Sequence, residues 1–181
     1  MVFNLDPLDI DLDFARRPYR LGDTITATVT FMPKGNVEIR KAALNLMGQV
    51  RRTKASTGRM MGMQGGAGLQ GGNSFTTTDY VPMQQLTEQQ MSTEVFCSTQ
   101  IVSNKSLQKG EVSRHIVQLR LDRKLEKLQS LSREADMLQR DSNSGLSIDP
   151  WWLEVQADVV MGRDAIARRQ VEIVGALKAT T

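Results

Sequence analysis

The stretch RPYRLGDTITATVTF, residues 17–31, decides the fold class. From Thr24 to Phe31 threonine alternates with isoleucine, alanine, valine and phenylalanine. Successive side chains of a strand point to opposite faces, so this pattern predicts a strand with one buried and one exposed face. Pro18 and Gly22 are turn residues that separate it from the preceding segment. We therefore expect a sheet that covers a core on one side.

Similar short alternating segments recur along the chain, without the strand–helix alternation of a parallel sheet. Seven half-buried strands predict an all-β protein, an immunoglobulin-like two-sheet antiparallel β-sandwich, because two sheets cover every apolar face. The other six are expected at 9–14, 42–50, 92–102, 111–121, 151–161 and 167–175. In the segment 92–102, one face is expected to hold Val95, Cys97, Thr99 and Ile101. The residues expected to face the core include Leu44, Leu46, Val117, Leu119, Val155 and Ile173.

Length and composition predict one domain over residues 1–181. Cys97 is the only cysteine, so no disulfide can form within the chain and a reducing compartment is expected. The N-terminal residues lack the pattern of a secretory signal, and no apolar stretch approaches the length that spans a bilayer. We therefore expect a cytoplasmic protein. The net charge of +3 is mild and the charges are interspersed, which favours solubility without implying a polyanionic partner.

Two stretches interrupt the strand pattern. Residues 55–90 are expected to form a long flexible loop rich in glycine and methionine, because the tract 58–72 has seven glycines in fifteen residues. Residues 123–140 place leucines at spacings of three and four, which predicts one inserted amphipathic helix. Its leucine stripe either caps the sandwich, the favoured alternative, or docks a partner through Leu128 and Leu131.

Catalytic and metal-binding motifs are incomplete. Residues 66–71, GAGLQG, match the dinucleotide fingerprint but lack the strand before it and the helix after it. The tract DIDLD from Asp9 lacks the glycine and glutamate of a calcium loop. His115 and Cys97 are single residues of their kinds, too few for a zinc site, and a catalytic pair would require them to meet. We therefore expect no catalytic residues, no metal and no cofactor.

Basic pairs and a tryptophan pair are the candidate binding features. Arginine or lysine pairs recur along the chain and could bind phosphates or an anionic membrane if folding clustered them. Nucleic acid is disfavoured as a partner, because aromatic residues for base stacking are few. One ring of the pair Trp151–Trp152 is expected to face the core and the other to face outward. The candidate partner-binding residues are Trp152, Leu128, Leu131, Arg51 and Arg52.

The order of these segments resembles the arrestin-like N-terminal domain. YRLGDTITATVTF, followed by ALNLMGQVRR, is similar to its second and third strands. FCSTQIVSNKSLQKGEVSRHIVQLRL and DPWWLEVQADVVMGRDAIARRQVEIV are similar to its later strands. The single sandwich looks most like the prokaryotic arrestin-like proteins related to sporulation control. A leucine-rich helix replaces the family's proline-containing crossover, and the ligase-docking motif Pro-Pro-x-Tyr is absent, so the resemblance does not imply a ubiquitin-ligase adaptor.

The resemblance implies a non-enzymatic protein–protein interaction module, an adaptor or scaffold whose partner is another protein. An anion- or membrane-surface-binding sandwich that uses clustered arginine and lysine is the alternative, and a hydrolase is a remote one. Peripheral membrane contact and self-association stay open.

Overall fold

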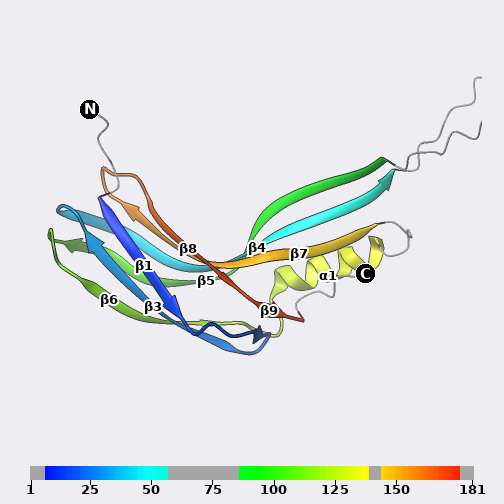
Figure 1. Cartoon of the computed structure of the whole chain (residues 1–181), viewed down its shortest axis with the longest axis horizontal. Coiled ribbons are helices and arrows are strands. Elements are labelled where there is room, and N and C mark those ends of the chain that lie inside the picture. Colours follow the sequence, from blue (N-terminus) through cyan, green and yellow to red (C-terminus); the bar gives the residue numbers. More distant parts are fainter. Residues whose placement is uncertain (1–6, 57–85, 139–143, 176–181) are drawn as a thin grey trace, which may run out of the picture.

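The computed structural model describes residues 7–56, 86–138 and 144–175, and it confirms the all-β sandwich. One layer has the strand order β1-β3-β6, and the other has the order β5-β4-β7-β8, with neighbouring strands antiparallel (Figure 1). The first layer contains β1 (Leu8–Phe14), β3 (Thr24–Pro33) and β6 (Ser113–Arg120). The second contains β4 (Val37–Ser56), β5 (Leu86–Leu107), β7 (Gly145–Val159) and β8 (Ala165–Val171).

A third, two-stranded sheet joins the turn before β3 to the end of the described chain. It consists of β2 (Tyr19–Arg20) and β9 (Ile173–Val174), which pair in parallel. The two sheets of the sandwich are antiparallel as predicted, and this short parallel pair lies outside them.

The strand that decides the fold lies at the centre of its sheet, between β1 and β6. The four apolar side chains of β3 from Ile25 to Phe31 are completely buried, while Thr24 and Thr26 are exposed, so the predicted alternation is confirmed. Five of the six residues predicted to face the core are buried: Leu44, Leu46, Val117, Leu119 and Val155. The sixth, Ile173, is only half-buried and packs at the margin of the core in β9.

Along β5, the side chains that point to the core do not follow the predicted alternation. A register shift between Leu46 and Met47 of β4 leaves Phe96 as an extra residue on β5. Phe96 is buried and Val95 is 44% exposed, so the expectation that Val95 shares the inward face with Cys97 is wrong. A β-bulge inserts one residue into the alternation, and a pattern with a strict period of two cannot anticipate it.

The two layers differ in length. β4, β5 and β7 have 20, 22 and 15 residues, whereas the strands of the facing sheet have 7, 10 and 8. The three long strands continue past the facing sheet, and α1 (Glu126–Leu138) lies beneath this extension (Figure 1). Leu128 and Leu131 of α1 are buried, so the helix caps the fold, as favoured from the sequence. It begins three residues later than predicted.

Charged pairs hold α1 beneath the extension. Arg52 of β4 donates hydrogen bonds to both carboxylate oxygens of Glu134, at 2.7 and 3.2 Å, and a third to Ser92. Lys127 forms an ion pair with Glu94 of β5. The hydrogen bond from Lys127 lowers the pKa of Glu94, and the bond to Glu134 raises the pKa of Arg52. These contacts attach the helix to two neighbouring strands.

The predicted loop at 55–90 is shorter than expected at both ends. β4 continues to Ser56 and β5 begins at Leu86, so these ends of the segment are strand. The remainder, including the glycine-rich tract 58–72, lies outside the described residues.

Gly48 of β4 lies where the four-stranded sheet passes from its packing against the three-stranded sheet to its packing against α1. A Cβ atom at this position would lie 2.7 Å from Ile148 Cγ2 and 2.9 Å from Phe96 Cε2. We predict that Gly48→Ala lowers the free energy of unfolding by about 1–3 kcal/mol, because the core has no room for a methyl group. Gly145→Ala, where nothing lies within 4 Å, is the control and should change it by no more than about 0.5 kcal/mol in urea titrations. Equal effects of the two substitutions would refute the packing constraint.

The leucine stripe of α1 gives a second prediction. The double substitution Leu128→Glu, Leu131→Glu should lower the melting temperature by about 10 °C, because each buried leucine contributes roughly 1.5–3 kcal/mol. Met137→Glu is the matched control, since Met137 lies on the same helix and is 71% exposed. Calorimetry that finds an unchanged melting temperature for the double variant would contradict capping by the helix.

Candidate functional site

The turn between β1 and β3 is fixed by Tyr19, which is buried at 2% exposure. Its hydroxyl donates a 2.8 Å hydrogen bond to the carbonyl oxygen of Ala15, and its amide donates one of 2.9 Å to the carbonyl of Glu172. The Arg17 guanidinium stacks over the Tyr19 ring at 4.5 Å. Gly22 adopts a φ of 101°, which favours glycine, where the chain turns into β3. Tyr19 thus anchors the turn to β9.

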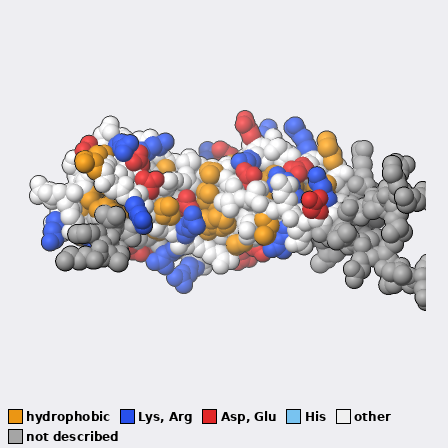
Figure 2. All heavy atoms as spheres, turned by 90° about the horizontal axis from the view of Figure 1, so that it is seen from above, with side chains coloured by type: hydrophobic (Ala, Val, Ile, Leu, Met, Phe, Trp, Pro, Cys, Tyr) orange, Lys and Arg blue, Asp and Glu red, His pale blue; other side chains and the backbone are white. Residues whose placement is uncertain are grey.

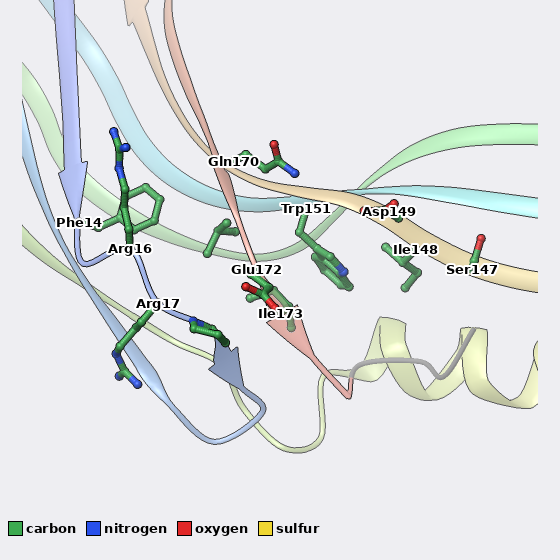
Figure 3. A pocket seen from close by; sticks show the side chains of 12 residues that line it. Phe14, Arg16, Arg17, Ser147, Ile148, Asp149, Trp151, Gln170, Glu172 and Ile173 are labelled. Atoms are coloured by element: carbon green, nitrogen blue, oxygen red, sulfur yellow. The ribbon is translucent and has the colours of Figure 1, made fainter. Parts of the chain in front are cut away.

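A groove of about 680 Å³ opens beside this anchored turn, between β1, β7 and the strands β8 and β9 (Figure 3). Its floor is apolar, and Trp151 and Val171 are its buried members. The Trp151 ring packs against Phe96 with the centroids 4.5 Å apart, which fixes its position in the floor. The other apolar residues that line it are Phe14, Pro18, Ile148 and Ile173.

The rim of the groove carries both signs of charge. Arg16 and Arg17 come from the turn, Asp149 comes from β7, and Glu172 is the residue between β8 and β9. Figure 3 shows the two arginine side chains extending in opposite directions from the turn. Arg17 pairs with Asp23, whereas Arg16 forms no ion pair with any residue in the described ranges. Within the described part of the chain, the Arg16 charge is therefore unpaired beside an apolar floor.

A smaller hollow of about 300 Å³ continues the groove along the seam between β1 and β8. The two hollows share Phe14, Arg16 and Gln170. β1 and β8 are the edge strands of their sheets, so each has one side that pairs with no other described strand. The groove thus combines an apolar floor, a charged rim and unpaired backbone, which are the features that bind extended peptides.

None of the five sequence-predicted partner-binding residues lines this groove. Leu128 and Leu131 are buried under the extension, and Arg52 holds α1 in place. Trp152 is half-buried on the opposite face of β7, where its Nε1 is enclosed and has no hydrogen-bond partner among the described residues. Arg51 is exposed on that same outer face, because adjacent strand residues point to opposite sides.

The sequence analysis missed the residues that do line the groove. The sequence indicates that one ring of the Trp151–Trp152 pair faces the core and that Phe14 belongs to the first strand, but it does not show that Trp151 and Phe14 line one opening. The tract RRPYRLGD gave one usable signal, since Arg16 and Arg17 flank the tyrosine that anchors the turn. Asp149 and Glu172 reach the rim of the groove only because distant segments meet in the fold, and no local sequence pattern predicts this position.

Cys97 and His115, which a catalytic pair would require to meet, have other neighbours. Burial raises the pKa of Cys97 to about 11, so the thiol stays protonated at neutral pH. His115 Nε2 instead lies 2.9 Å from Ser113 Oγ, which also accepts a 2.7 Å hydrogen bond from Lys105 Nζ. Ser113 is only 8% exposed. This small network joins β5 to β6 at the edge of the sandwich.

The basic pairs are largely neutralised. The four pairs are Arg16–Arg17, Arg40–Lys41, Arg51–Arg52 and Arg168–Arg169. In each of them at least one member forms an ion pair with a carboxylate: Arg17 with Asp23, Arg40 with Asp158, Arg52 with Glu134, Arg168 with Glu154 and Arg169 with Asp11. The clustering that an anion-binding surface requires is therefore not evident in the part of the chain that the structure describes. Within the same residues no cluster of three potential metal-ligating side chains occurs, and no helix has the length and apolarity needed to cross a bilayer.

Comparison with known proteins gives a likeness of fold. No protein-family model matches the sequence, and no curated protein sequence matches it. The fold is similar to that of Spo0M. The crystal structure of this sporulation control protein from Bacillus subtilis aligns with a TM-score of 0.56 and 12% sequence identity over 92% of this chain. The chain spans 49% of the Spo0M chain. At this identity the likeness supports the arrestin-like sandwich and shows the fold alone.

His115 gives a prediction for pH dependence. Burial, and then the Lys105 charge, lower its pKa below the ordinary value. The unfolded chain therefore binds a proton more readily, and the stability contributed by neutral His115 is complete above the unfolded pKa of about 6.5 and lost as the pH falls through the folded value. Urea titrations of wild type and His115→Gln at pH 7.5 and at lower pH should show the larger loss in wild type. Parallel losses in both proteins would mean that His115 is not the responsible group.

Proposed function

We propose that the chain is a non-enzymatic protein-binding module, and that it holds an extended segment of a partner protein in the groove along the β1–β8 seam. The observation that carries the proposal is the coincidence of an apolar floor at Trp151 and Val171 with the unpaired edges of β1 and β8. Alternate side chains of an extended peptide can enter such a floor while its backbone lies along a strand edge.

The rim explains the preference for a protein partner. A surface for nucleic acid or an anionic membrane presents mainly positive charge, whereas this rim combines Arg16 with Asp149 and Glu172. Mixed charges around an apolar centre are typical of protein interfaces, in which rim charges select the partner and the core supplies affinity. An adaptor or scaffold role follows from this site, and the fold likeness to Spo0M is compatible with it.

A photo-crosslinking amino acid tests the groove directly in cells of the source organism. At Gln170, which lines both hollows and is exposed, it should capture a partner protein that mass spectrometry can identify. Gln118, exposed on β6 away from the groove, is the matched control position. Arg16→Glu should weaken binding of the captured partner by about tenfold, or ~1.4 kcal/mol, while Arg114→Glu on β6 should not.

The outcomes separate the candidate functions. Crosslinks to protein at Gln170 but not at Gln118, lost with Arg16→Glu, support the proposal. The same adducts at both positions, or no protein adduct at Gln170, overturn it. Adducts to lipid or nucleic acid at Gln170 would favour an anion-binding surface instead.

A further inference from the structure

The part of β5 that runs over α1 is an open sheet edge. β5 pairs only with β4 and stands at the end of the order β5-β4-β7-β8, so the backbone groups on its other side have no partner among the described strands. Figure 1 shows β5 and β4 extending together, away from the three-stranded sheet. An edge of this kind is a template on which another strand can pair.

The usual protections of an edge strand are few in this part of β5. Residues 86–104 contain no lysine, arginine or proline, and their only charged residues are Glu88 and Glu94. Glu94 is engaged with Lys127 of α1 beneath the sheet. The bulge at Phe96 lies beyond the stretch 88–95 and leaves its ladder with β4 regular. Natural edges are normally blunted by charges, prolines or bulges.

The outer face of this edge also carries exposed apolar side chains. Met91 is 59% and Val95 44% exposed, and they stand two positions to either side of Thr93 on one face of the strand. Val95 is opposite Met47 of β4, which in turn is opposite Trp152 of β7. Figure 2, which looks down on the molecule from above Figure 1, shows hydrophobic side chains gathered among charged ones near the middle of this view.

We propose that this edge is a self-association surface, on which β5 of one chain pairs antiparallel with β5 of a second copy about a two-fold axis at Thr93. In this register Met91 of each copy lies opposite Val95 of the other, on either side of a Thr93–Thr93 pair. The exposed apolar residues then cover one another, and apolar and threonine cross-strand pairs stabilise a sheet. The two four-stranded sheets become one continuous sheet.

Charge selects this register over its neighbours. An axis at Met91 would place Glu88 of each copy opposite Glu94 of the other, and like charges directly opposite destabilise a sheet. The axis at Thr93 places Glu94 opposite Ser92 and Glu88 opposite Ser98, so no acids face each other. The two-fold arrangement also keeps the outer faces of both copies on one side, with a helix α1 under each half, so neither helix obstructs the pairing.

Sedimentation of the purified chain tests the surface. We expect the mass to rise with concentration from 20.2 kDa to about twice that value. Met91→Lys with Val95→Lys should keep the chain monomeric at the same concentrations, because both positions are exposed and lysine at an edge opposes pairing. Ile116→Lys is the matched control, since Ile116 is 74% exposed on the other sheet and its variant should still dimerise. A wild type that stays monomeric, or a dimer that survives the lysine pair, overturns the proposal.

The register has its own test. Antiparallel partners across a ladder have Cα atoms about 4.5–5.5 Å apart, which suits a disulfide. In a Cys97→Ala background, Thr93→Cys should form a disulfide-linked dimer on mild oxidation, and Thr26→Cys, exposed on β3, should not. Equal crosslinking of the two variants, or none at Thr93, rules out the Thr93 axis. A partner that binds only in the β1–β8 groove would leave this result unchanged, so the two proposals fail separately.

Discussion

The structure depends on a difference in length between its two layers. β4, β5 and β7 have 15 residues or more, whereas no strand of the facing sheet exceeds 10. A sheet face that runs past its facing layer exposes apolar side chains to water unless another element covers it. Leu128 and Leu131 of α1 supply that cover, and the Arg52–Glu134 pair fixes the helix against the strands. The inserted helix therefore completes the core.

The groove follows from the same difference. The inner face of the four-stranded sheet passes from packing against the three-stranded sheet to packing against α1. Close to this junction Gly48 has no room for a side chain, while Trp151 packs on Phe96 and lines the opening. Tyr19 holds the β1–β3 turn against β9 at the margin of the gap. The candidate binding site thus lies beside this junction, between the β1–β3 turn and the middle of β7.

Local patterns were enough to predict most of the fold. The alternation from Thr24 to Phe31 identified the central strand, and the leucine spacing identified the helix, because each pattern reports which side chains one element buries. The bulge at Phe96 and the ends of β4 and β5 were missed, since they depend on pairing with another strand. The candidate site was missed for a related reason. Trp151 and Glu172 line one groove only because their segments meet in the fold. Arg51 and Arg52 are adjacent in the sequence but lie on opposite faces of β4, so they do not form the basic cluster that their adjacency suggested.

The open edges of the sandwich differ in what lies beside them. Where two layers face each other, side chains bridge the seam, as Arg169 does to Asp11 on one side and Lys105 to Ser113 on the other. Over the extension β5 faces no second described sheet, because α1 lies beneath the sheet and pairs with β5 through Lys127 and Glu94. A helix can bury the face of a sheet, but it cannot satisfy the backbone groups along the edge, which only a strand, a loop or water can do. The length difference that required the helix therefore also leaves the β5 edge open for pairing over the extension.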